Sequence, residues 1–306
     1  MRFISYEFAG QAAIGLLTGP GQQHIIPLAA GGRRYLGQTE LPSSMQALIE
    51  QGDAALEKVR AIATKAAKDP DSGIQLRLDQ VRLLAPIPRP AKNIFCIGKN
   101  YAEHAMEFEK TADPSIAIPQ YPVIFTKAPT TVIGPGAGIK CHSLITRALD
   151  YEVELAVIIG KQGSYIKPEE AMDYVFGYTI LNDITARDLQ KQHLQWFRGK
   201  SLDTSAPMGP CLVHKSEISH PDKLTVSLKV NGETRQHAST ADFLFSIPTL
   251  ISTLSQGITL EAGDIISTGT PAGVGAARKP PQFLQPGDRL ELTISTIGTL
   301  INTVIA

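Results

Sequence analysis

The sequence predicts a mainly β protein with a few peripheral helices, preceded by a small α/β segment. Beyond Asn93, short runs rich in β-branched residues are bounded by Gly, Pro and Asp, which is typical of strands that end in turns. These runs are NIFCIG, YPVIFTKA, EVELAVIIG, YVFGYTIL, LTVSLKVNG, DIISTG and RLELTIS. Helical patterns are few, at about 101–110, 168–173, 184–195 and 246–255. Strands and helices therefore do not alternate as they do in a parallel βαβ sheet.

The first part of the chain is organised differently. Residues 2–8 and 12–17 predict two short strands joined by a Gly turn. Residues 43–68 predict one or two helices capped by Ser43 or Ser44. This stretch therefore combines both kinds of element.

A proline-rich connection separates the two regions. Pro86, Pro88 and Pro90 are spaced by two, which favours a stiff, extended segment. We therefore predict a small α/β N-terminal domain at 1–88 and a catalytic domain at 89–306.

Composition and charge narrow the class of protein. Lys+Arg and Asp+Glu both number 29, and hydrophobic residues make up 43%, which is ordinary for a globular chain with a core. A balanced charge indicates neither nucleic acid nor an anionic membrane as partner. The N-terminus alternates like a strand and is interrupted by Glu7 and Gly10, so we expect no signal peptide and no membrane span.

The three cysteines predict neither a disulfide framework nor a zinc cluster. Cys96, Cys141 and Cys211 lie far apart, without a C-x-x-C pair. We expect reduced thiols in a cytoplasmic protein.

Two glutamates interrupt the apolar run LDYEVELAVIIG at 149–160. Successive side chains of a strand point to opposite faces, so Glu152 and Glu154 share a face, roughly 6–7 Å apart. One interpretation is a half-buried strand with both glutamates in water. The AVIIG continuation favours another, because it lacks polar alternation and indicates burial on both faces.

A third carboxylate, Asp183, follows the apolar run YVFGYTIL. Its simplest role is to cap a helix. If it lies buried beside Glu152 and Glu154, the three charges need compensation. The run EVELAV has no Lys or Arg at cross-face spacing, so we predict a divalent ion. Oxygen ligands suit Mg²⁺, Mn²⁺ or Ca²⁺, and the lack of nearby His or Cys at zinc spacing disfavours zinc.

A His/Glu pair follows the predicted strand NIFCIG. His104 and Glu107 are three residues apart, so on a helix they share a face. A carboxylate beside an imidazole fixes the tautomer and raises the basicity, which suits a general base; a surface helix with incidental charges is the alternative. The Pro-punctuated segment 111–122 is expected to work with this helix as a lid.

Two further segments carry candidate binding groups. WFRGKSLDTSAPMGP at 196–210 reads as a loop that places Lys200 in solvent or against a developing enolate or substrate carboxylate. STGTPAGVG at 267–275 lacks the spacing of a P-loop or a dinucleotide-binding turn. Its backbone N–H groups and Thr270 are candidates to hold a small anion such as a carboxylate.

Taken together and in order, these segments resemble the fumarylacetoacetate hydrolase family over about residues 92–305. The segments are GKNYAEHAMEF, PVIFTKAPTTVIGPG, LDYEVELAVIIGK, GYTILNDITARDLQ, WFRGKSLDTSAPMGP, VNGETRQ, TLEAGDIISTGTPAGVG and LQPGDRLEL. The chain is most similar to bacterial acylpyruvase-like or 2-hydroxyhepta-2,4-diene-1,7-dioate isomerase-like members with an extra N-terminal domain. The resemblance implies a mixed β-roll/β-sandwich core and a homodimer.

The resemblance also implies residue roles. The implied metal ligands are Glu152, Glu154 and Asp183, for Mg²⁺ or a related ion. The implied catalytic residues are His104, Glu107 and Lys200, and the implied substrate-binding residues are Gln190 and Thr270. Many relatives have Leu or Arg at the position of Lys99, whose side chain we expect to point to solvent.

The implied activity is metal-dependent hydrolysis of a C–C bond in a 2,4-dioxo acid of the acylpyruvate type, through an enolate held by the metal. His104, braced by Glu107, would deprotonate the attacking water. The same residues would also serve an isomerase, a keto–enol tautomerase or a decarboxylase acting on a 2-oxo (di)carboxylic acid, such as oxaloacetate or a hydroxymuconate-type compound. A non-catalytic binding protein is disfavoured by the complete catalytic set. We expect a cytoplasmic catabolic enzyme whose partner is a small 2-oxo acid.

Overall fold

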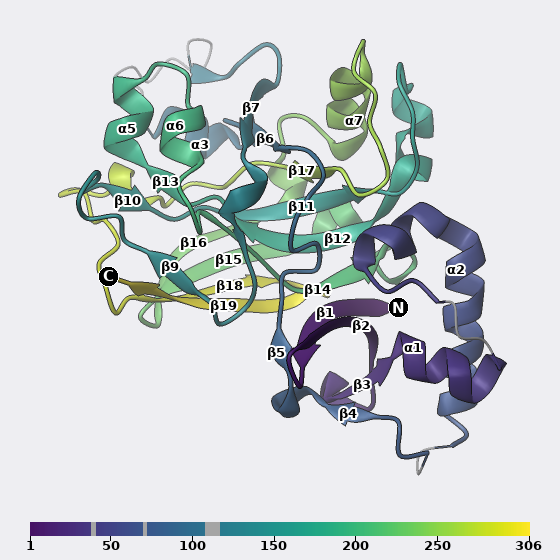
Figure 1. The fold of residues 1–306 in the computed structure, drawn as a ribbon. Coiled ribbons are helices and arrows are strands. Elements are labelled where there is room, and N and C mark those ends of the chain that lie inside the picture. The colour runs from purple at the N-terminus through teal and green to yellow at the C-terminus, as the bar shows by residue number, and fades with distance from the viewer. Residues whose placement is uncertain (38–40, 70–71, 108–116) are drawn as a thin grey trace.

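Three sheets carry the part of the chain that the computed structural model describes, which is residues 1–37, 41–69, 72–107 and 117–306. The fold is mainly β with α, as the sequence predicts (Figure 1). In spatial order the large sheet contains β4 (Leu76–Arg77), β3 (His24–Pro27), β2 (Gln11–Thr18), β1 (Arg2–Phe8), β14 (Ala206–His214), β12 (Val175–Asn182), β11 (Val153–Ile159), β17 (Ile265–Ser267), β6 (Ile94–Gly98) and β7 (Val123–Lys127), with β5 (Arg82–Leu83) paired to β1 and β8 (Val132–Ile133) paired to β14.

A smaller sheet packs against the large one. Its strands, in order, are β16 (Glu233–Ser239), β15 (Thr225–Val230), β18 (Arg289–Ile294), β19 (Gly298–Ile305) and β9 (Gly138–Lys140). A short pair is formed by β10 (Leu149–Asp150) and β13 (Thr185–Ala186). Leu155 and Val157 of β11 join one hydrophobic core with Leu228 and Leu292 of the smaller sheet, so the main core lies between the two sheets.

Most helices gather at two ends of the molecule, and α7 lies apart from both groups. Figure 1 shows α1 and α2 beside β1–β3, and α3, α5 and α6 at the end that carries β6 and β7. The α-helices are α1 (Leu28–Gly31), α2 (Met45–Ala66), α3 (Ala102–Met106), α5 (Arg187–Gln192), α6 (Phe197–Lys200) and α7 (Ile247–Ser255). Short 3₁₀ turns are η1 (Pro20–Gln22), η3 (Leu78–Gln80), η4 (Pro129–Thr131), η5 (Pro168–Tyr174), η6 (Lys215–Glu217), η7 (Pro221–Lys223), η8 (Thr240–Asp242) and η9 (Gly275–Ala277), and η2 (Gly32–Leu36) is a π-helical turn.

Strand β11 is buried on both faces, which its AVIIG continuation predicts. Its two faces enter different cores: Leu155 and Val157 face the smaller sheet, while Ala156 and Ile158 pack in a second core with Leu48 of α2. Glu152 and Glu154 lie on the same face of the strand as Ala156 and Ile158. Their side chains are therefore buried and do not lie in water.

The N-terminal elements follow the sequence pattern. Strands β1 and β2 match the two predicted strands, and α2 begins after Ser44, whose hydroxyl accepts a hydrogen bond from the amide of Ala47 at 3.2 Å. Within α2, Gly52 has non-helical angles (φ 52°, ψ −132°), which interrupts the helix.

Strand β14 is the longest element that the sequence pattern did not predict, and β16 and β19 are also absent from the predicted strands. Residues 206–210 read as part of a Gly-, Ser- and Pro-rich loop, yet they begin a strand between β1 and β12. The ladder to β12 tolerates Pro210 because the register shifts beside it, so no amide is needed there. The pairing of Phe3 with Leu212 joins the N-terminal strands to the same sheet, and the domain boundary after residue 88 stays a prediction.

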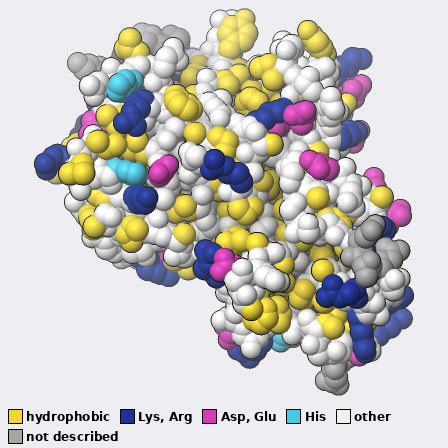
Figure 2. Space-filling view, in the orientation of Figure 1, with side chains coloured by type: hydrophobic (Ala, Val, Ile, Leu, Met, Phe, Trp, Pro, Cys, Tyr) yellow, Lys and Arg dark blue, Asp and Glu magenta, His cyan; other side chains and the backbone are white. Residues whose placement is uncertain are grey.

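The distribution of surface charge and the burial of the cysteines are ordinary for a globular chain. Figure 2 shows Lys and Arg interspersed with Asp and Glu on the visible face, in keeping with the zero formal net charge. Cys96, Cys141 and Cys211 are all buried and unpaired with one another. Among the described residues, no helix is long and apolar enough to cross a membrane.

Candidate active site

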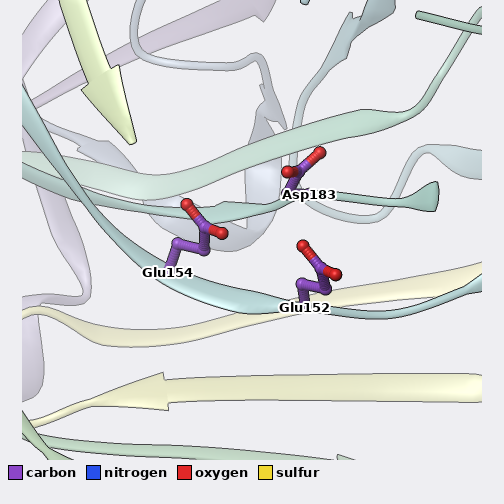
Figure 3. Close-up of side chains that lie close together, drawn as sticks. All are labelled: Glu152, Glu154 and Asp183. Carbon is purple, nitrogen blue, oxygen red and sulfur yellow. The ribbon is translucent and has the colours of Figure 1, made fainter. Parts of the chain in front are cut away.

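Three carboxylates meet where β11 and β12 run side by side. The ladder pairs Val153 with Asn182, and the amide of Asp183 donates to the carbonyl of Glu152 at 2.9 Å. Figure 3 shows Glu152 and Glu154 pointing to the same side of β11, where Asp183 lies. One carboxylate oxygen from each residue lies within 4.8 Å of the others, and all three side chains are buried. The structure thus brings the three predicted ligands together.

Three buried cations pair with this cluster, which the sequence analysis did not foresee. Lys200 Nζ lies 2.7 Å from Glu152 Oε2 and 2.6 Å from Asp183 Oδ2. Lys127 Nζ lies 2.7 Å from Asp183 Oδ1. Arg187 bridges Glu152 Oε1 at 2.6 Å and Asp150 Oδ2 at 2.8 Å. The sequence analysis considered only the EVELAV run, which has no Lys or Arg at cross-face spacing, whereas these partners come from other elements.

The two glutamates differ in how much nearby positive charge stabilises their ionised forms. Burial alone would raise the pKa of Glu152, but Lys200 and Arg187 outweigh it and lower that pKa to about 2. Burial, together with the negative charges of Asp183 and Glu152, raises the pKa of Glu154 to about 8. Glu154 is therefore the carboxylate with the least cationic support.

The donor set fits a divalent metal ion. With Asp150 included, four carboxyl groups face three cations, so one negative charge lacks a cationic partner in this described cluster once all four are ionised. Glu154 Oε2 accepts hydrogen bonds from Ser267 Oγ at 2.5 Å and from the Gly269 amide at 3.0 Å, which orients the carboxylate. Converging, buried and all-oxygen ligands with surplus negative charge are what a hard divalent cation requires.

The predicted dyad is formed at the end of α3. His104 Nδ1 lies 2.8 Å from Glu107 Oε2, and His104 is buried. Glu107 Oε1 accepts a hydrogen bond from the amide of Gly273 at 2.6 Å, so the carboxylate is held from both sides. This pairing keeps a proton on Nδ1 and makes Nε2 the basic nitrogen of the ring.

The Gly-rich turn after β17 binds anions, but those anions belong to the protein. Its amides at Gly269 and Gly273 donate to Glu154 and Glu107 respectively. The amides of Gly275 and Ala276 donate to the two oxygens of Asp150 at 2.7 Å and 3.0 Å. The sequence analysis made these amides candidates to hold a small anion such as a carboxylate, and the carboxylates that they contact here are the protein's own.

A cavity of about 320 Å³ opens over this cluster. It is lined by Ile97, Gly98, Lys99, His104, Phe125, Glu152, Glu154, Arg187, Gln190, Lys191, Leu194, Trp196, Lys200, Thr270 and Ala276. Asp183 and Glu107 lie behind this lining, where Asp183 contacts Lys200 and Glu107 contacts His104. The structure thus gathers around one cavity residues that lie far apart in the sequence.

Two of the candidate binding residues have fixed hydrogen bonds. Arg187 Nη1 donates to Gln190 Oε1 at 3.2 Å, and because an arginine can only donate, the amide NH₂ of Gln190 is the end available to a ligand. Thr270 Oγ1 donates to the carbonyl of Val153 at 3.0 Å and accepts from Gln236 at 2.9 Å. Thr270 therefore braces the turn against β11 while it lines the cavity.

Lys200 and Lys99 lie differently from the sequence expectation. Lys200 is the last residue of α6 and is buried, so it does not lie in a solvated loop. Gly199 allows this, because a Cβ there would lie 2.6 Å from the amide nitrogen of Gln190. Lys99, expected to point to solvent, is half-buried and lines the cavity.

Several residues of the site had no recognised role in the sequence. Asp150, Lys127 and Arg187 hold the carboxylate cluster through the contacts above. A partial signal existed for Arg187, since it lies three residues before Gln190 at the expected start of a helix. Half of the predicted lid segment, residues 111–116, lies outside the described residues, as do residues 108–110 of the predicted helix before it.

The comparisons identify the family. The model described as fumarylacetoacetate (FAA) hydrolase C-terminal matches residues 93–305. Oxaloacetate tautomerase YisK of Bacillus subtilis is 50% identical over 306 residues, which cover 99% of this chain and 100% of that relative. A mitochondrial oxaloacetate tautomerase of Bos taurus is 42% identical over 268 residues, or 87% of this chain and 81% of that relative. The chain belongs to the fumarylacetoacetate hydrolase family and is an enzyme of that family.

Solved structures agree with this assignment. The fumarylacetoacetate hydrolase from Exiguobacterium antarcticum has a TM-score of 0.80 and 41% identity, covering 100% of this chain and 99% of that chain. Maleylpyruvate hydrolase from a Sphingobium species, in complex with manganese(II) and pyruvate, has a TM-score of 0.75 and 28% identity, with 100% and 99% covered. The fold is therefore that of the family, and a relative of this fold contains a divalent ion.

The comparisons overturn the predicted activity. The sequence analysis favoured C–C hydrolysis of a 2,4-dioxo acid, whereas the relatives at 50% and 42% identity are named oxaloacetate tautomerases. The prediction was wrong because metal ligands and a His/Glu dyad serve both reactions equally.

Proposed function

We propose that this protein is a keto–enol tautomerase that acts on oxaloacetate. The observation that carries the proposal is 50% identity, over almost the whole chain, to a protein named for that activity. The site is compatible with it, because a base and a carboxylate cluster share one cavity. Tautomerisation needs only a proton transfer between C3 and the C2 oxygen, so no water has to be activated.

The side chains suggest how that proton moves. His104, held by Glu107 through Nδ1, would take the proton from C3 at Nε2 and then deliver it to the C2 oxygen to complete the enol, and ketonisation would run through the same two transfers in reverse. Negative charge develops on the C2 oxygen as the proton leaves. The Lys200 ammonium lines the same cavity and would stabilise that charge.

The carboxylate cluster would hold the metal. Glu152, Glu154 and Asp183 are the proposed ligands, and Mg²⁺ is the proposed ion, with Mn²⁺ or Ca²⁺ as substitutes. When bound, such an ion supplies a Lewis acid that polarises the 2-oxo group of the substrate. The homodimer that the family resemblance implies and the cytoplasmic location expected from the cysteines both stay predictions.

The test is to follow the ketonisation of enol-oxaloacetate by ultraviolet absorbance, with Mg²⁺ and with EDTA. We expect metal-dependent acceleration, and a loss of about 10²–10⁴-fold in kcat for His104→Gln, the range typical of a general base. Nuclear magnetic resonance should detect no pyruvate above the uncatalysed background. If the wild-type protein leaves ketonisation unchanged, or releases pyruvate at the same rate, oxaloacetate tautomerisation is not its activity.

A further inference from the structure

A tyrosine lies in the chain between two carboxylates of the site. Tyr151 separates Asp150 from Glu152, and its side chain is 1% exposed. It packs in the core between the two sheets, together with Val153 and Leu155 of β11, whereas Glu152 lines the cavity. Neighbouring side chains of an extended segment point to opposite sides, so Tyr151 points to the side of the chain that faces away from the cavity.

The hydroxyl group of this tyrosine contacts the Gly-rich turn after β17. Tyr151 Oη donates a hydrogen bond to the carbonyl of Gly273 at 3.1 Å. A phenylalanine would fill nearly the same space in the core, and it would bury no polar group that needs a partner. The contact with Gly273 is therefore one that a phenylalanine could not make.

Gly273 connects this tyrosine to the dyad. The amide of Gly273 donates to Glu107 Oε1 at 2.6 Å, and the other oxygen of that carboxylate contacts His104 Nδ1 at 2.8 Å. Gly273 thus accepts a hydrogen bond from Tyr151 on one side of its Cα and donates one to Glu107 on the other. A continuous chain of hydrogen bonds therefore runs from the tyrosine hydroxyl to the imidazole.

The backbone at Gly273 requires glycine. Its φ is 110°, in the region that favours glycine, and a Cβ there would lie 1.9 Å from the carbonyl oxygen of Arg235 in β16. Glycine has the largest conformational freedom of all residues, so its peptide groups need outside contacts to keep one orientation. Tyr151 supplies such a contact at Gly273 itself.

The turn has separate anchors before and after Gly273. Before it, the side-chain amide of Gln236 donates to the carbonyl of Pro271 at 2.7 Å. After it, the backbone amide of Gly275 donates to Asp150 at 2.7 Å. Both anchors hold residues on either side of Gly273. The tyrosine hydroxyl therefore acts at the residue that contacts the dyad.

We propose that Tyr151 is a positioning residue for the catalytic dyad: through Gly273 it fixes the orientation of Glu107 and thereby of the His104 ring. This inference rests on the proposed function, in which His104 is the base. Because Tyr151 does not line the cavity, removal of its hydroxyl should slow proton transfer and leave the binding of substrate and metal unchanged.

The kinetic test removes the hydroxyl alone. For Tyr151→Phe, we expect kcat for ketonisation of enol-oxaloacetate to fall about 3–10-fold, the range that corresponds to one lost hydrogen bond. KM and the Kd for Mg²⁺ should stay within about twofold. Glu107→Ala lacks the carboxylate through which the tyrosine acts. In that background, adding Tyr151→Phe should therefore lower kcat by less than about twofold.

Tyr178→Phe is the matched control, because it removes another fully buried tyrosine hydroxyl from the same core. That hydroxyl has no hydrogen-bond partner among the described residues, so its loss should leave kcat unchanged. The inference is overturned if Tyr151→Phe leaves kcat unchanged, or if it changes KM or the Kd for Mg²⁺ as much as kcat. An equal effect of Tyr151→Phe with and without Glu107, or an equal loss of kcat in Tyr178→Phe, overturns it as well.

A spectroscopic measurement separates this inference from the proposed function. Nuclear magnetic resonance of protein with isotope-labelled histidine follows the Nδ1 proton of His104, which the contact with Glu107 protects from exchange with water. We expect this exchange to be at least about threefold faster in Tyr151→Phe, toward the rate in Glu107→Ala, and unchanged in Tyr178→Phe. That result supports the role of Tyr151 even if oxaloacetate is not tautomerised. Exchange at the wild-type rate in Tyr151→Phe, or exchange in wild type as fast as in Glu107→Ala, overturns the role of Tyr151 and leaves tautomerisation to stand on its own assay.

Discussion

Glu152 and Glu154 show how two identical side chains on one strand face acquire opposite properties. Lys200 and Arg187 contact Glu152 and stabilise its charge. Glu154 receives a hydroxyl and an amide, which orient it but bring no full positive charge. The first is therefore a permanent anion, and the second becomes an anion at the cost of repulsion from its neighbours.

This difference predicts that metal binding is linked to a proton. In metal-free protein Glu154 has a pKa raised to about 8, so a metal must displace a proton below that pH. We expect metal affinity to rise about tenfold per pH unit from pH 6 to 8 and to level off above. Calorimetry in buffers of different ionisation enthalpy measures the released proton.

The matched variant is Glu154→Gln, which keeps the shape and removes the titrating group. It should bind metal more weakly and release no proton at this site. The same pKa has a consequence for stability: the unfolded carboxyl ionises near 4.5, so Glu154 makes the metal-free fold less stable as pH rises from about 4.5 to 8. A pH-independent affinity in wild type would contradict the assignment.

At the scale of elements, close packing of short segments builds the cavity. α6 lies against α5 because Gly199 has no side chain, and this brings Lys200 to the cluster. The carbonyl of Lys200 in turn accepts a hydrogen bond from Lys127. The cluster thus depends on the distance between two helices of one or two turns each.

Gly199→Ala should disturb both stability and catalysis. The added methyl group would lie 2.6 Å from the Gln190 amide nitrogen, so α6 must move. We expect a loss of about 1–3 kcal/mol in unfolding free energy, as for overpacking, and a lower kcat because Lys200 shifts. Arg198→Ala, at the exposed neighbour in α6, is the control for chemical denaturation and turnover. Unchanged kcat in Gly199→Ala would mean that the position of Lys200 does not depend on the close packing of α6 against α5.

At the scale of the whole molecule, the N-terminal strands and the catalytic region share one sheet. Phe3 of β1 is fully buried, and its ring lies 6.2 Å from that of Phe176 in β12. The carbonyl of Met1 accepts from the amide of His214 at the end of β14 at 3.0 Å. These contacts suggest that the two regions unfold together.

Phe3→Ala tests that coupling. Removing a buried phenylalanine typically costs about 3–5 kcal/mol, and we expect one cooperative transition to move to lower temperature. Phe8→Ala at the end of β1, where the side chain is 42% exposed, should change the melting temperature little. Two separate transitions in calorimetry would instead show that residues 1–88 unfold on their own.

A histidine at the same junction, His214, is predicted to make the fold less stable in acid. Burial, with the N-terminal amine and Lys215 nearby, lowers the pKa of His214 to about 4. The unfolded histidine protonates near pH 6.5, so this contribution is complete above 6.5 and is lost as pH falls toward 4, by on the order of 2–3 kcal/mol. His214→Asn should lose less stability than wild type between pH 7 and 4 in urea titrations. Parallel curves for the two proteins would contradict the shift.

The sequence by itself determined which of the candidate site residues share a strand face and which lie together on a helix. Period-two alternation placed Glu152 and Glu154 on one face, the AVIIG continuation indicated that this face is buried, and the spacing of His104 and Glu107 predicted their contact. These are local properties, because residues two to seven apart set them. Strand β14 escaped prediction, since Gly and Pro hide its β pattern and its pairing with distant β1 supports it.

Only the tertiary structure decided which charges meet. Lys127, Arg187 and Lys200 reach the carboxylates from separate elements, and the amides of the Gly-rich turn are used by the protein's own anions. The activity also lay beyond the local pattern, because hydrolase and tautomerase share the same ligands and dyad. Cavity shape depends on long-range packing, such as Trp196 over Gly98, and no local periodicity encodes it.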